Sequence, residues 1–169
     1  KNLTVFDNNA KAEHLLKQVF IGREWMAKEV HAWMNTADSQ TMMIYGVPGS
    51  GKSAFSANLS QYNPNIIGNI FFEWNNTSLT DVDYVVKLLA LKLAVRLPDY
   101  RKMLCNLLPN SEEAKKLIQN YHGDALFDLL VLNPLQCCIN GNRDTYAFVF
   151  DGLDETSSKV TELLLRKAQ

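Results

Sequence analysis

The stretch GVPGSGKSAF, residues 46–55, places three glycines and a proline directly before an apolar helical pattern. Glycine has no Cβ, so the backbone can curl closely around a ligand. The run GVPGSGKS has the spacing G-x-x-x-x-G-K-[ST] of a phosphate-binding loop, or P-loop. In such a loop several backbone N–H groups converge on the phosphates, and the helix that follows adds its own unpaired N–H groups. The stretch therefore predicts a nucleoside triphosphate site.

The side chains of this loop have separate predicted roles. Lys52 is expected to reach the β- and γ-phosphates, and the Ser53 hydroxyl is expected to ligate Mg²⁺. A glycine-rich turn with an accidental Lys-Ser pair is the alternative, but a buried strand before the loop and a helix after it favour the P-loop. The residues predicted to contact the nucleotide are Gly46, Val47, Pro48, Gly49, Ser50, Gly51, Lys52, Ser53 and Ala54.

A second motif, YAFVFDGLDE at residues 146–155, is an apolar run that ends in Asp151. A strand is rigid, so it would hold this carboxylate beside the magnesium ion, as a Walker B strand does. Asp154 and Glu155 follow within one turn, and a carboxylate there can orient or deprotonate the water that attacks the γ-phosphate. We predict Asp151 as a metal ligand and Glu155 as the base, with Asp154 as the competing candidate.

Strands and helices are expected to alternate along the chain. Continuous apolar runs predict buried strands at 41–45, 66–74 and 146–150. Helical patterns are found at 20–36, at 54–62, from a cap at Thr80 to a stop at Pro98, from Ser111, and at 123–132 and 160–166. This alternation predicts a three-layer α/β/α fold around a mainly parallel sheet.

Composition limits the classes of function. The chain has 169 residues, a net charge of −1 and 47% hydrophobic residues, which suits one globular domain. Its balanced charge gives no signal for direct binding of nucleic acid or of a membrane surface, and no apolar run reaches the length of about 18 residues that a membrane span needs. Three cysteines, Cys105, Cys137 and Cys138, fit reduced thiols better than a disulfide framework. We expect a cytoplasmic protein.

Taken together, GVPGSGKS and FVFDGLDE resemble the NACHT group of STAND NTPases, which are relatives of AAA+ ATPases. The distinctive part is DGLDE at residues 151–155. In addition, FIGRE at residues 20–24 is similar to the GRE segment that precedes the P-loop in STAND and AAA+ proteins. That similarity implies that Gly22 and Arg23 lie near the adenine.

The resemblance implies an ATP-driven switch with ATP, ADP and Mg²⁺ as ligands. ADP would hold a closed state, and exchange for ATP would permit self-association, while effector and sensor domains would lie elsewhere in a longer chain. In this family the sheet order is 5-1-4-3-2, and strand 4 follows the Walker B strand in sequence. Only residues 156–169 follow that strand here, and they have a helical pattern. We therefore expect a partly helical lead-in at 1–19 and a partial NACHT domain at 20–169 that lacks strand 4 and later elements.

Rival functions differ in what they would require. A GTPase needs an Asn-Lys-x-Asp guanine reader, which the sequence lacks. A P-loop kinase is disfavoured because Asp-Gly-Leu-Asp-Glu suits activation of water more than transfer to a bound acceptor. A nucleotide-gated scaffold that binds ATP or ADP and does not hydrolyse it stays open, because the same carboxylates would serve slow hydrolysis and tight binding.

Overall fold

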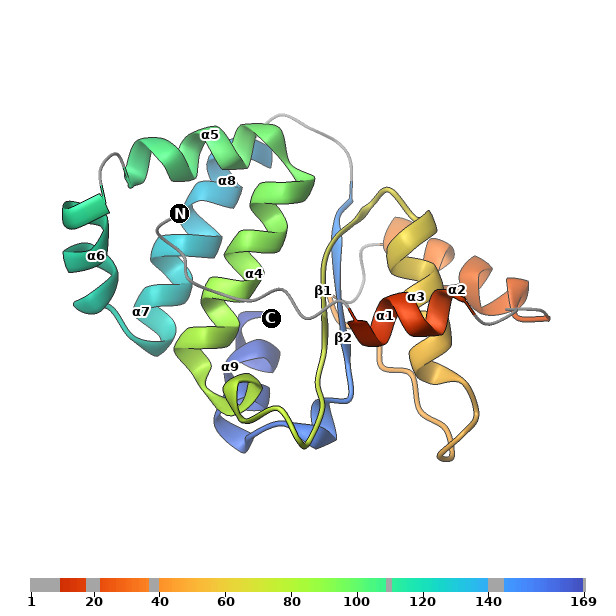
Figure 1. The fold of residues 1–169 in the computed structure, drawn as a ribbon. Helices are drawn as coiled ribbons and strands as arrows, with labels where there is room; N and C mark the ends of the chain where they lie inside the picture. Colours follow the sequence, from red (N-terminus) through yellow and green to blue (C-terminus); the bar gives the residue numbers. More distant parts are fainter. Residues whose placement is uncertain (1–9, 18–21, 37–39, 109–110, 140–144, 169) are drawn as a thin grey trace.

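A computed structural model describes residues 10–17, 22–36, 40–108, 111–139 and 145–168, and Figure 1 shows their arrangement. Two strands, β1 (Ile66–Phe71) and β2 (Ala147–Asp151), form a parallel sheet. The α-helices are α1 (Ala10–Leu16), α2 (Glu24–Thr36), α3 (Lys52–Tyr62), α4 (Val82–Arg96), α5 (Pro98–Leu107), α6 (Ser111–Gln119), α7 (Gly123–Phe127), α8 (Asn133–Ile139) and α9 (Ser158–Lys167). Short helical turns are η1 (Thr77–Thr80), the π-type turn η2 (Asp128–Leu132) and η3 (Leu153–Glu155).

The register of the two strands brings their carboxyl ends together. Ile66 lies opposite Ala147, and Phe71 lies opposite Asp151. Beyond the last pair, the Phe72 N–H donates to the Asp151 carbonyl at 2.8 Å. Because the strands are parallel, side chains that follow β1 and β2 emerge at the same edge of the sheet.

Helices cover both sides of the strands (Figure 1). On one side lie α1, α2 and α3, and α2 packs on α3 through a buried cluster that includes Val30, Met34, Phe55 and Leu59. On the other side α4 packs on β1. The larger of the hydrophobic clusters lies on this side, and it includes buried residues of α4 and of the helices that surround it. The prediction of a mixed α/β fold with a parallel sheet is confirmed at this level. None of the described helices is long and apolar enough to cross a membrane.

The prediction of a strand at 41–45 was wrong. The segment has no regular secondary structure, and its apolar side chains are exposed, with Met43 at 52% and Tyr45 at 79%. An apolar run becomes a strand only where a neighbour supplies ladder hydrogen bonds. Within the described ranges, the sheet has two strands, and β2 pairs with β1. The segment is tied to α9, since the Thr41 hydroxyl donates to the Ala168 carbonyl at 3.4 Å.

The ends of the helices differ from the sequence interpretation around α4. Its cap is Asp81, whose carboxylate accepts from the Tyr84 N–H at 2.7 Å, and Thr80 belongs to η1 instead. Pro98 does lie just beyond the end of this helix, but it also begins α5, which the sequence interpretation missed. Proline suits the first turn of a helix because the N–H that it lacks would have no partner there.

Candidate functional site

The glycine loop lies at the end of the molecule where both strands finish. In Figure 1 the chain runs through this loop into the lower end of α3, and β1 and β2 also end at the bottom of the view. The loop precedes α3, which begins at Lys52, and α3 packs against both strands. The fold therefore packs the helix that follows the glycine loop against both strands, one of which ends in Asp151.

Two glycines of the loop have a left-handed backbone conformation. Gly49 has φ +75° and Gly51 has φ +83°, both in the left-handed region that costs an L-residue about 1–2 kcal/mol. A turn from Val47 to Ser50 is closed by the Ser50 N–H, which donates to the Val47 carbonyl at 3.1 Å. A Cβ on Gly46 would lie 2.9 Å from the Ser50 hydroxyl oxygen, so a side chain there would require the Ser50 hydroxyl to turn away.

The Lys52 ammonium is folded over the loop. Its Nζ donates to the Gly46 carbonyl at 2.7 Å and to the Val47 carbonyl at 3.1 Å. Its positive charge thus lies among the backbone groups that are predicted to surround phosphate. Ser53 follows in the first turn of α3, where its N–H belongs to the unpaired set at the start of the helix.

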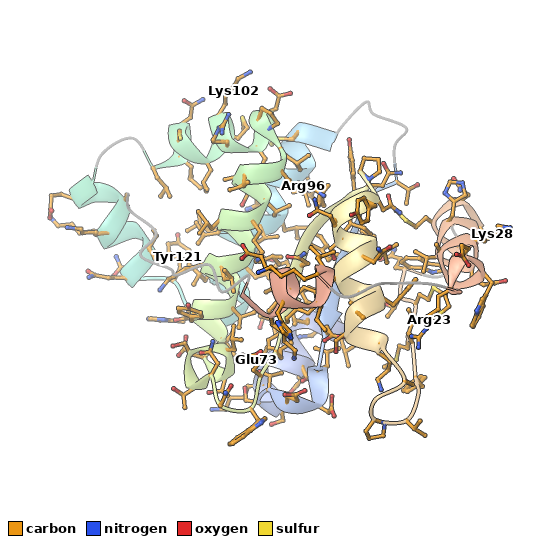
Figure 2. All side chains as sticks on the ribbon, turned by 45° about the vertical axis from the view of Figure 1, so that its right-hand side comes forward. Arg23, Lys28, Glu73, Arg96, Lys102 and Tyr121 are labelled. Carbon is orange, nitrogen blue, oxygen red and sulfur yellow. The ribbon has the colours of Figure 1, made fainter. Side chains whose placement is uncertain are left out.

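Arg23 is also brought to the loop, whereas Gly22 is not. The Arg23 Nη2 donates to the Ser50 carbonyl, and a Cβ on Gly51 would lie 2.7 Å from the Arg23 Nη1. Figure 2 shows Arg23 between α2 and the loop. Gly22 is exposed, has φ +82° and has nothing within 4 Å of the place where its Cβ would be. The structure therefore shows a contact between Arg23 and the glycine loop, and the implied place near adenine stays a prediction.

Asp151 is a buried carboxylate with an incomplete set of partners. Its side chain accepts from the Ser56 hydroxyl through Oδ1 at 3.2 Å. The residue is 7% exposed, and Oδ2 is buried with no hydrogen-bond partner among the described residues. A buried oxygen of this kind is costly unless a donor or cation satisfies it. Ser56, one turn along α3 from Ser53, is a site residue that the sequence interpretation missed.

The two carboxylates after Asp151 occupy different environments. Glu155 is half-buried, and its Oε2 accepts from the Trp74 N–H at 3.2 Å, whereas Asp154 is exposed. Gly152 has φ +73°, and a Cβ there would lie 3.0 Å from the Phe72 carbonyl oxygen. The tight turn at this glycine places Glu155 against the segment that follows β1. Of the two candidates, Glu155 is the one that the fold holds beside the neighbouring strand.

Another acidic residue at this edge was missed. Glu73 lies just after β1, as Asp154 and Glu155 lie just after β2. The sequence signal that could have identified it is an acidic residue directly after an apolar run. The Lys11 Nζ donates to the Phe72 carbonyl at 3.1 Å and lies 4.0 Å from a Glu73 carboxylate oxygen. Lys11 belongs to α1, so the predicted lead-in contributes a helix that contacts this edge of the sheet (Figure 2).

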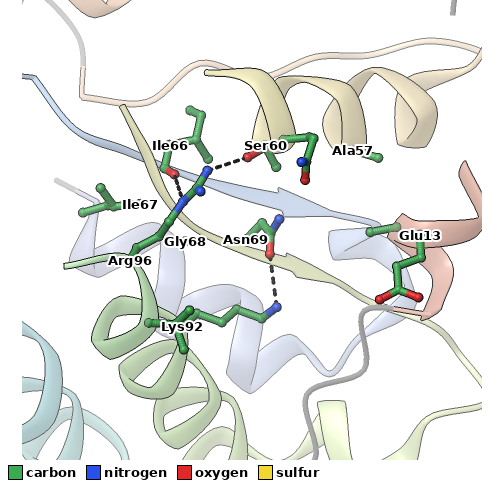
Figure 3. A pocket seen from close by; sticks show the side chains of 12 residues that line it. Glu13, Ala57, Ser60, Ile66, Ile67, Gly68, Asn69, Lys92 and Arg96 are labelled. Atoms are coloured by element: carbon green, nitrogen blue, oxygen red, sulfur yellow. Dashed lines mark hydrogen bonds between the residues drawn. The ribbon is translucent and has the colours of Figure 1, made fainter. Parts of the chain in front are cut away.

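A separate pocket of about 240 Å³ lies along β1, between α1, α3 and α4 (Figure 3). Arg96, one of the cations that line the pocket, donates to the Ser60 carbonyl at 2.9 Å and to the Ile66 carbonyl at 3.3 Å. The Lys92 ammonium donates to the Asn69 side-chain oxygen at 3.1 Å. Arg96 thus satisfies one of the last carbonyls of α3 and a carbonyl at the start of β1. These polar side chains therefore have a structural role, which is to satisfy backbone and side-chain groups of α3 and β1.

Ser53 and Asp151 carry oxygen atoms of the kind that Mg²⁺ prefers, and phosphates and water commonly complete a magnesium site. In the part of the chain that the structure describes, no group of three or more His, Cys, Asp or Glu side chains could hold a metal by itself.

Comparison with known proteins gives one result. No curated protein and no solved structure matches the chain. One family model, described as "Nephrocystin 3, N-terminal", matches residues 23–169. The match begins at Arg23 and includes the glycine loop, both strands and the DGLDE motif. Because this model covers most of the 169 residues, the chain belongs to the nephrocystin 3 N-terminal family.

Proposed function

We propose that the protein is a P-loop module of the NACHT type that binds Mg-ATP and ADP and hydrolyses ATP slowly. The observation that carries this proposal is the hydrogen bond between Ser56, on the helix that follows the glycine loop, and the buried Asp151 at the end of β2. The loop itself contains left-handed glycines and leads into this helix, and the second oxygen of Asp151, Oδ2, has no partner among the described residues. Under this proposal the helices on both sides of the sheet are the outer layers of a three-layer P-loop fold.

The nucleotide would be held mainly through its phosphates. The N–H groups of the loop and of the first turn of α3 would bind phosphate oxygens, helped by the positive end of the helix dipole. The Lys52 ammonium would move from the Gly46 and Val47 carbonyls to the β- and γ-phosphates. Ser53 and Asp151 would hold Mg²⁺, which when bound neutralises negative charge on the phosphate oxygens.

Hydrolysis would require Glu155 to act on water. Its carboxylate would accept a proton from the water whose oxygen attacks the γ-phosphorus, and the bond from that phosphorus to the β–γ bridging oxygen would break to leave ADP and inorganic phosphate. In the structure this carboxylate accepts from the Trp74 N–H at 3.2 Å. Hydrolysis should be slow because a hydrogen bond to the charged carboxylate lowers its basicity and so weakens it as an acceptor of the proton from water.

The same hydrogen bond favours a second candidate function. If the Glu155 carboxylate stays hydrogen-bonded to the Trp74 N–H, it would not activate water. The protein would then be a nucleotide-gated scaffold, which binds ATP or ADP and changes its contacts without turnover. In either case the family resemblance suggests that exchange of ADP for ATP controls self-association. Effector and sensor domains would then belong to other parts of a longer protein.

Turnover by native protein, Glu155→Gln and the control Glu162→Gln separates these functions. Glu162 is exposed on α9, so its substitution should leave turnover unchanged. Phosphate release by native protein and the control, with loss in Glu155→Gln and unchanged Mg-ATP affinity, supports the ATPase. Tight Mg-ATP binding without phosphate release in native protein supports the scaffold, and equal turnover by native protein and Glu155→Gln excludes Glu155 as the base.

A further inference from the structure

Arg23 holds a peptide group of the phosphate loop from outside. Its guanidinium donates to the Ser50 carbonyl, which belongs to the peptide that joins Ser50 to Gly51. In a trans peptide the C=O and the following N–H point in opposite directions, and the described residues contain no cis peptide bond. The guanidinium that fixes this carbonyl therefore also fixes the direction of the Gly51 N–H, on the opposite side of the peptide.

Two features favour glycine at position 51. Its φ of +83° lies in the left-handed region. Moreover, a Cβ would lie 2.7 Å from the Arg23 Nη1, 2.8 Å from Nη2 and 2.9 Å from Cζ, so a side chain would displace the guanidinium. The absence of a side chain at Gly51 therefore leaves the guanidinium in contact with the loop.

The backbone of Arg23 is well placed to hold the loop. Its carbonyl accepts from the Met26 N–H at 3.0 Å at the start of α2. Further along α2, Val30 and Met34 are buried in one cluster with Phe55 of α3, the helix into which the loop leads. The guanidinium thus connects two packed helices to the loop that lies beside them.

We propose that Arg23 is a positioning residue that turns the Gly51 N–H toward the phosphates of the bound nucleotide. This inference rests on the proposed function, and it assigns Arg23 to the phosphate end of the ligand. It differs from a role in adenine recognition, because it predicts that Arg23 affects the binding of phosphate chains that carry no base. The positive charge of Arg23 would add a longer-range attraction for the same anion.

The test compares native protein with Arg23→Gln, Arg23→Lys and the control Lys28→Gln. Lys28 is an exposed cation on α2 (Figure 2), so its substitution removes the same charge without touching the loop. The probes are inorganic tripolyphosphate and Mg-ADP, measured by calorimetry. The amide resonance of Gly51, followed by ¹⁵N NMR without ligand, reports the orientation of the peptide itself.

Arg23→Gln should weaken both probes about tenfold, which corresponds to about 1.4 kcal/mol, and should shift the Gly51 resonance. Arg23→Lys should recover part of both effects because an ammonium can donate to the same carbonyl. Lys28→Gln should change neither. Weaker binding of Mg-ADP with unchanged binding of tripolyphosphate would overturn the inference in favour of adenine recognition. An unshifted Gly51 resonance, or equal losses in Arg23→Gln and Lys28→Gln, would overturn it as well.

Failure of the proposed function has a different signature. If native protein binds neither tripolyphosphate nor Mg-ADP, the proposed function is wrong and this inference falls with it. If native protein binds both and Arg23→Gln binds them equally well, only the inference about Arg23 is wrong.

Discussion

Replacing Asp151 by asparagine should stabilise the protein without ligand and remove its response to magnesium nucleotide. The native carboxylate is 7% exposed and its Oδ2 has no partner among the described residues, and burial of an unpaired charge costs more free energy than burial of a neutral amide of the same shape. Asparagine keeps an oxygen that can accept from the Ser56 hydroxyl, and its neutral NH2 group takes the place of the charged Oδ2. We expect the free energy of unfolding to rise by about 1 kcal/mol, which raises the Tm by about 2–4 °C for a chain of this size.

The assay is thermal unfolding of native protein, Asp151→Asn and the control Asp154→Asn, with and without Mg-ATP. Native protein at a ligand concentration of about 100 times Kd should gain about 2.7 kcal/mol, and Asp151→Asn should gain far less. Asp154 is exposed, so its variant should behave as native protein does. The reasoning is refuted if Asp151→Asn is less stable than native protein without ligand and gains the native amount with it.

Two further predictions concern the helices behind the site. Tyr100 is completely buried, and its hydroxyl donates to the Leu130 carbonyl in the π-type turn. Tyr100→Phe leaves that carbonyl without its donor, so it should lower the free energy of unfolding, measured by urea titration, by about 1–3 kcal/mol. An unchanged free energy of unfolding would contradict this contact. Burial tends to raise the pKa of Asp83, but hydrogen bonds from the Gly123 N–H and from His122 outweigh it and lower that pKa below its ordinary value. The stability that this lowered pKa contributes is fully present above the pKa of the unfolded state, and it is lost as the pH falls through the pKa of the folded state. Asp83→Asn should therefore reduce the loss of stability that urea unfolding measures between about pH 6 and pH 3. An unchanged loss of stability in this range would contradict the assignment.

Local signals in the sequence were sufficient for the motif-bearing elements. The carboxyl end of β2 falls at Asp151, where the apolar run ends, and α3 begins at Lys52, where the glycines end. Glycine conformation at Gly49 and Gly51 followed from the steric needs of a tight loop, because few other residues tolerate such φ values. These features depend on short stretches of chain, which is why their pattern predicted them.

The features that were missed depend on partners far away in the chain. Whether 41–45 forms a strand depends on a neighbouring strand, and hydrophobicity alone does not supply one. Glu155 meets the Trp74 N–H, and Ser56 meets Asp151, across 81 and 95 residues. No local spacing encodes such contacts. Pro98 shows a different difficulty, since one residue both follows the end of α4 and opens α5.

The most direct test of the central claim is calorimetric titration of native protein with Mg-ATP, repeated with Lys52→Ala and with Lys102→Ala. Lys102 is exposed on α5 and pairs with Asp99 at 2.9 Å, so it controls for the loss of a positive charge. We predict saturable binding by native protein and Lys102→Ala, and at least a tenfold loss of affinity in Lys52→Ala. Binding that is equally strong in Lys52→Ala, or no binding by native protein, would contradict the assignment of the glycine loop as a phosphate site.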